Sequence, residues 1–108
     1  MDYLIAAANS SFEAKDNVRA SREVEEALSN LGNLYGRDPK QIKVLRHYAN
    51  AYKLQGDIGR AAGNQSAEID ALRSQASALG QILILDPGNH DAEAELQGIS
   101  VRMRSLGK

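Results

Sequence analysis

Four polar side chains between residues 43 and 53 are the strongest candidates for chemistry in this chain of 108 residues. They follow one another at spacings of three, four and three, which places them on one face of a helix. Three are cations and one carries an amide, so together they can bind an anion through charge-assisted hydrogen bonds. We therefore predict a surface that binds a protein or peptide partner, acidic in character, formed by Lys43, Arg46, Asn50 and Lys53.

The alternative interpretation is a solvated face of an amphipathic helix, which is the usual role of a charged stripe. Residues 37–60 carry six basic and two acidic side chains, whereas the whole chain has a formal net charge of −1. The positive charge is therefore local, and nothing global indicates binding to nucleic acid or to a membrane surface. The basic surface does not recur, because the equivalent positions in the sequence repeat described below are Asp91, Ala94, Gly98 and Val101.

The sequence predicts no catalytic residues, no cofactor and no metal site, and hence a protein that is not an enzyme. There is no cysteine, which excludes disulfides, thiol catalysis and thiolate metal ligands. The two histidines, His47 and His90, have no second ligand at metal-binding spacing and are interpreted as surface residues. No phosphate-binding glycine motif and no nucleophile elbow is present.

Two tyrosines accompany the basic stripe on the same predicted helix. Tyr48 and Tyr52 are four positions apart and therefore share a face. Two readings remain open: aromatic side chains that bind a partner, or packing residues whose hydroxyl groups reach water or the backbone.

A short segment occurs twice in the chain. The copies run from Ser29 to Pro39 and from Ser77 to Pro87, with Leu-Gly and Asp-Pro at corresponding positions. Every matching position is shifted by the same amount, which we call the repeat offset. A fixed offset of this size indicates a repeat architecture, in which each unit buries its apolar face on the next. Such an architecture favours an interaction surface over a reaction centre.

Abundant alanine, leucine, glutamate and arginine, with only 5% aromatic residues, favour helix over sheet. The two Asp-Pro steps predict that helices end near Tyr35 and Leu85, and that new ones begin near Pro39 and Asp91. In the final helix Ser100 stands where Tyr52 would repeat. That helix is therefore interpreted as an end-cap.

An apolar stripe predicts one unusually long helix. We expect Gly56 to end the preceding helix and Asp57 to cap this one. From there the stripe alternates spacings of four and three, which predicts a continuous helix over Ile58–Leu85, roughly 40 Å long. The alternative is a break near Gly63–Ser66, since each interior glycine costs about 1 kcal/mol. The stripe consists of Ile58, Ala62, Gln65, Ile69, Leu72, Ala76, Leu79 and Leu83.

The repeat offset predicts a matching long helix at about Ser10–Tyr35. The expected fold class is all-α: an antiparallel helical hairpin array of about five helices, two of them long. Residues 1–108 form a single domain of ordinary size. Because the pattern stops within a repeat at both ends, we interpret the domain as a fragment of a longer array.

Residues 45–61 resemble the first helix and turn of a tetratricopeptide repeat, and residues 27–39 and 79–87 resemble the close of its second helix. The resemblance covers about residues 24–90 and implies a solenoid whose first helices line a concave groove. It also implies that the basic stripe is similar to the clamp with which some members hold a peptide's terminal carboxylate. The unit here is longer than the family's unit, and we assign the extra turns to the second helix. The residues carrying the first match are Leu45, Tyr48, Ala49, Tyr52, Gly56, Asp57 and Ala61.

The leading functional hypothesis is a protein-interaction scaffold that binds its partner in a helix-lined groove. The alternative is a self-assembly module, in which the long heptad-patterned helices pair with a second copy and Gln65 fixes the register. No segment has the pattern of a signal peptide or of a membrane span. The compartment stays open: the cytoplasm is slightly favoured, and the periplasm fits a segment of a longer protein.

Overall fold

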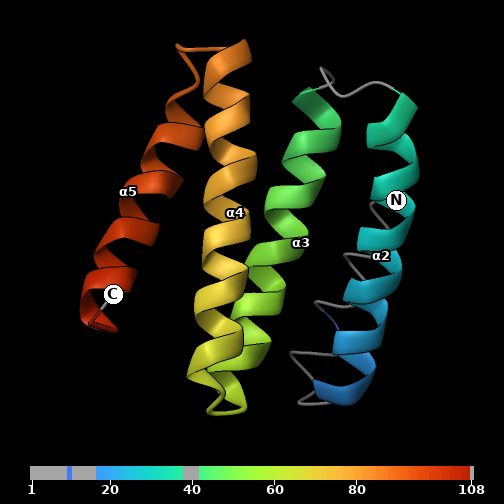
Figure 1. Ribbon diagram of the computed structural model, residues 1–108, viewed down its shortest axis with the longest axis vertical. Coiled ribbons are helices and arrows are strands. Elements are labelled where there is room, and N and C mark those ends of the chain that lie inside the picture. The colour runs from blue at the N-terminus through green and yellow to red at the C-terminus, as the bar shows by residue number, and fades with distance from the viewer. Residues whose placement is uncertain (1–9, 11–16, 38–41, 108) are drawn as a thin grey trace.

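The computed structural model describes residue 10, residues 17–37 and residues 42–107. Within this part of the chain the helices are α2 (Asn17–Arg37), α3 (Ile42–Ala61), α4 (Gln65–Leu85) and α5 (His90–Ser105). Neighbouring helices lie side by side and run in opposite directions (Figure 1). The predicted all-α class is confirmed.

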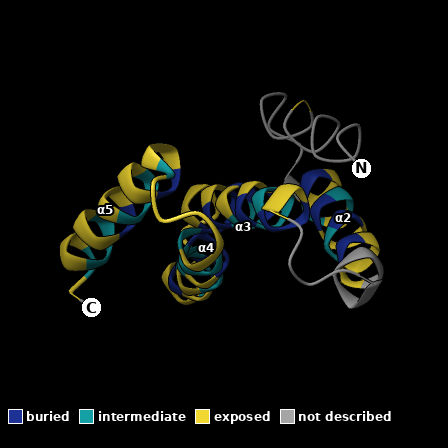
Figure 2. Ribbon diagram, turned by 90° about the horizontal axis from the view of Figure 1, so that it is seen from above, coloured by how far each residue is buried: buried dark blue, intermediate teal, exposed yellow. Residues whose placement is uncertain are grey.

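Among the described helices, the backbones approach closely only between neighbours in the sequence, and the α3–α4 interface is the most extensive. Seen from above, the helices form a curved row (Figure 2), with buried residues on the sides that face a neighbour. One core cluster joins α3, α4 and α5, and two smaller clusters join α2 to α3. The largest fully buried side chains are Val24, Leu31, Leu45, Leu79 and Ile82.

The predicted continuous helix over Ile58–Leu85 is wrong, and the alternative break is correct. α3 ends at Ala61, and Gly63 follows with φ of +72°. The Gly63 N–H donates to the carbonyl of Arg60 at 3.1 Å, and the Asn64 N–H donates to the carbonyl of Gly59 at 2.8 Å. These two bonds form a Schellman motif, which satisfies the last carbonyls of the helix and needs the left-handed conformation that glycine adopts easily.

Asn64 completes the turn by starting the next helix. Its side-chain oxygen accepts a hydrogen bond from the Ala67 N–H at 3.1 Å, so Asn64 is the N-cap of α4. Asn89 does the same for α5 through the Ala92 N–H at 3.0 Å. The predicted roles of Gly56 as a helix end and Asp57 as a cap are therefore wrong, since both lie inside α3.

Glycines inside α3 let it approach α4 closely. A Cβ atom on Gly59 would lie 3.0 Å from the backbone nitrogen of Glu68 and 3.3 Å from Cβ of Ala67. A Cβ atom on Gly56 would lie 3.5 Å from Cβ of Ala71. The loss of helix propensity at these glycines is therefore offset by tight packing between the two helices.

The helix boundaries follow the repeat offset. The bounds of α2, Asn17 and Arg37, correspond under this offset to those of α4, Gln65 and Leu85, and the start of α3 corresponds to that of α5. α3 has 20 residues and α4 has 21, so the extra length is shared between the two helices of the unit. The prediction that the extra turns belong to the second helix alone is thus wrong for this pair. The first Asp-Pro step, at residues 38 and 39, lies outside the described residues.

Candidate partner-binding cleft

A cleft of about 230 Å³ lies between α3 and α5, with α4 as its floor. Its walls carry charged side chains from α3 and α5, and its floor combines polar and apolar groups from α4. The lining residues that matter most for its charge are Lys53, Asp57, Arg60, Glu68, Glu95 and Arg102. This cleft is where residues far apart in the sequence bring opposite charges together.

The four predicted binding residues lie on one face of α3, as their spacing requires. Lys43, Asn50 and Lys53 are exposed, and Lys53 lines the cleft. Arg46 is half-buried and forms an ion pair with Glu95 of α5. The structure thus leaves three of the four side chains accessible and commits the fourth to a contact within the chain.

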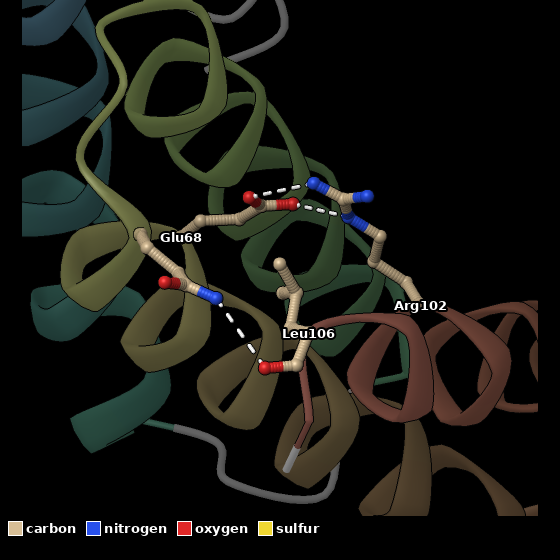
Figure 3. A network of polar contacts seen from close by, with 4 residues as sticks. Glu68, Arg102 and Leu106 are labelled. Carbon is tan, nitrogen blue, oxygen red and sulfur yellow. Dashed lines mark hydrogen bonds and ion pairs between the residues drawn. The ribbon is translucent and has the colours of Figure 1, made fainter.

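Glu68 and Arg102 form a second ion pair, between the floor and the α5 wall (Figure 3). The guanidinium donates from Nε to Oε2 at 2.7 Å and from Nη2 to Oε1 at 3.0 Å. The Glu68 residue is only 5% exposed, so this bidentate pair is largely removed from water on the carboxylate side. The hydrogen bonds from Arg102 hold the pKa of Glu68 below its ordinary value despite its burial, and they raise the pKa of Arg102.

Asp57 adds a negative charge to the α3 wall. Loss of solvent around its carboxyl raises its pKa above the ordinary value, while the neighbouring cations Lys53 and Arg60 oppose that rise. The wall therefore alternates positive, negative and positive charge along the helix. A partner that docks here therefore meets both signs of charge on this wall.

The Glu68–Arg102 pair replaces an apolar contact of the first repeat. One repeat offset earlier, the corresponding positions are Ala20 and Leu54, which are both buried in one core cluster between α2 and α3. Neither Glu68 nor Arg102 was predicted from the sequence to be part of a site. The sequence did contain a signal for this pair: between the two repeats, Ala20 is replaced by the acid Glu68, and Leu54 is replaced by the base Arg102.

The two tyrosines lie on a different side of α3 from the basic stripe. Their ring centroids are 6.0 Å apart with planes inclined by 16°, so the rings stack. Both are half-buried, and Tyr48 packs against two core clusters. Packing is therefore part of their role.

The histidines are separated by the fold: His47 lies half-buried in α3, and His90 is exposed at the start of α5. Among the described residues, no group of three or more histidine, aspartate and glutamate side chains is placed to hold a metal ion. None of the described helices combines the length and the apolar character needed to cross a membrane.

Comparisons of the chain with protein-family models, with curated proteins and with solved structures found no match.

Proposed function

We propose that this chain is a tetratricopeptide-like interaction scaffold and that the cleft between α3 and α5 binds a protein or peptide partner. The observation that carries the proposal is the accessible basic stripe of α3, in which Lys43, Asn50 and Lys53 are exposed and Lys53 lines the cleft. Fixed cations and amide donors on a helix bind carboxylates through charge-assisted hydrogen bonds. The repeated unit of two antiparallel helices, seen in the boundaries of α2 and α4, is the further support.

The charges already paired inside the cleft refine the expected partner. Arg46 is engaged by Glu95, and Arg102 by Glu68. The cations that remain for a partner are Lys43 and Lys53, with Arg60 beside Asp57. An acidic segment therefore competes with Glu95 for Arg46 when it binds.

Self-assembly through long heptad-patterned helices is the alternative function, and the following observations favour the scaffold over it. The predicted helix is divided at Gly63, and Gln65 lies at the start of α4, where its amide donates to the carbonyl of Leu106 at 3.3 Å. The seam residues Ile69 and Leu79 are 7% and 0% exposed, because they pack within the chain. A coiled-coil partner would find this seam already covered.

The test is a titration with a capped peptide of alternating glutamate and alanine, at low and at high salt. We expect Lys43→Ala combined with Lys53→Ala to weaken binding about tenfold, and added salt to weaken it as well. Glu95→Gln is expected to strengthen binding, because it releases Arg46. Arg73→Ala, at an exposed position of α4 that lines no cleft described above, is the matched control.

Two results would contradict the proposal. The first is binding that does not change with salt. The second is an affinity that survives the removal of Lys43, Arg46 and Lys53 together while the variant keeps its helical circular dichroism.

A further inference from the structure

A second cleft lies on the other side of α3. Tyr48 follows Arg46 by two positions, which turns it about 200° around the helix axis, away from the basic stripe. The cleft has a volume of about 270 Å³, slightly below the roughly 300–1,000 Å³ of small-molecule sites. The cleft therefore has room for a few residues of an extended peptide. Its described lining is Leu45, Tyr48, Tyr52, Ser74, Ser77, Ala78 and Gln81.

One wall of this cleft is the stacked tyrosine pair. The two rings lie nearly parallel, with centroids 6.0 Å apart and planes inclined by 16°. Tyr48 is held by the core, and its hydroxyl lies 3.7 Å from the point where a Cβ atom on Gly32 of α2 would be. The pair therefore forms a fixed aromatic ridge with little conformational entropy left to lose on binding.

The other wall is a row of hydroxyl and amide groups on α4. Ser74, Ser77 and Gln81 follow at spacings of three and four and share one face of the helix. The row rises about 10 Å from its first to its last residue. One turn of a polyproline II helix, three residues of about 3.1 Å each, has nearly the same length.

Charge separates this cleft from the first one. None of the described lining residues is charged, whereas the α3–α5 cleft is lined by six ionisable side chains. A charged segment placed here would lose water without gaining an ionic partner, which is costly. The cleft therefore favours an uncharged segment.

We infer that the tyrosine cleft binds an uncharged, proline-rich segment in the polyproline II conformation. Such a segment has no internal hydrogen bonds, so its carbonyls accept from the serine hydroxyls, while its pyrrolidine rings pack on the aromatic ridge. It is also preformed, which lowers the entropy lost on binding. A neutral oligosaccharide would pair with the same hydroxyls, but it is not preformed in the extended shape that the row of hydroxyl groups matches, and the test below separates the two.

The probe is decaproline with both termini capped, titrated into the full chain by calorimetry at about 50 mM and about 500 mM salt. We expect saturable binding that salt does not weaken. A capped Gly-Ser decamer is expected not to bind, and neither is a neutral hexasaccharide. This inference does not depend on the α3–α5 cleft, and Lys53→Ala is the control that separates the two sites.

Tyr52→Leu is expected to weaken decaproline binding at least tenfold, because it removes half of the ridge. Ser77→Asp is expected to do the same by introducing a charge, and it keeps the fold because Ser77 is exposed. Lys53→Ala leaves the affinity unchanged. The inference is overturned by the absence of saturable binding, by equal binding of the Gly-Ser decamer, by tighter binding of the hexasaccharide, or by an affinity that Ser77→Asp does not change.

Discussion

At the scale of single residues, the Glu68–Arg102 pair is the contact with the clearest consequences. Removing either partner leaves the other incompletely paired, so Glu68→Ala and Arg102→Leu are each expected to lower the melting temperature by roughly 5 °C or more. The double variant restores the residue types of Ala20 and Leu54, which pack in the first repeat. The double variant is expected to recover most of the lost melting temperature. Thermal unfolding of the wild type, the two single variants and the double variant measures this recovery.

If the double variant melts at the sum of the two single losses, the residues do not act as a pair and the comparison between repeats fails. Arg19→Ala serves as the control ion-pair variant. Arg19 forms a salt bridge with Glu23, and the Arg19 side chain is 71% exposed. Such surface pairs contribute little to the free energy of unfolding.

The Glu68 carboxylate also determines how the stability of the fold depends on pH. The folded state holds the pKa of Glu68 below the ordinary value of 4.5, so the unfolded chain takes up a proton first as the solution is acidified. The stabilisation is therefore fully present above about pH 4.5 and is lost as pH falls through the folded-state pKa. The melting temperatures of the wild type and Glu68→Gln should differ at pH 7 and converge only as pH falls through the folded-state pKa, which lies below 4.5.

Because every other carboxylate titrates in both proteins, the difference between the two curves isolates Glu68. A difference that stays constant from neutral to acid pH would show that Glu68 contributes through packing alone.

At the scale of elements, the α3–α4 interface depends on a glycine. Gly59→Ala places a Cβ atom 3.0 Å from the backbone nitrogen of Glu68, where no side chain can move aside. We expect a loss of about 1–2 kcal/mol in the free energy of unfolding, since overpacking exceeds the gain in helix propensity. Gly80→Ala is the matched control: nothing lies within 4 Å of its Cβ position, so it should gain up to about 1 kcal/mol. Chemical denaturation measures both, and equal effects would exclude close packing as the reason for Gly59.

The element boundaries show which sequence signals were reliable. The Asp-Pro step after Leu85 was read correctly, because proline disfavours helix in the residue before it, a constraint that acts locally. The turn at Gly63 was predicted only as the alternative, because apolar residues are needed on both sides of a tight hairpin and their spacing continued through it. Asn64, a good N-cap directly after a glycine, carried the missing information.

Only the α3 side of the candidate site could be predicted from the sequence. The basic stripe of α3 follows from the spacing of its own residues, and the structure places those residues on one face as expected. The ion pairs Arg46–Glu95 and Glu68–Arg102 join residues that are 49 and 34 positions apart in the sequence. No local pattern specifies such pairs, since they depend on how α5 packs.

At the scale of the whole molecule, the outer face of α5 differs from the corresponding face of α3. On α3 this face packs against α4 through Leu45 and Ala49, and Gly56 permits the close approach. The equivalent positions of α5, one repeat offset later, are Glu93, Gln97 and Arg104, all exposed. A polar outer face is the property of a capping helix in a repeat array, and the interpretation of the last helix as an end-cap stays a prediction.

This contrast predicts how to turn the cap into an interface. The triple variant Glu93→Leu, Gln97→Ala and Ser100→Tyr gives α5 the residue types that α3 carries at the equivalent positions. We expect it to associate, because it creates an apolar stripe that has no partner among the described residues. Multi-angle light scattering across a range of concentrations will show a mass that rises with concentration for the variant and stays constant for the wild type. A concentration-dependent mass for the wild type would instead mean that another surface drives self-association, and that the polar face of α5 does not keep copies of the molecule apart.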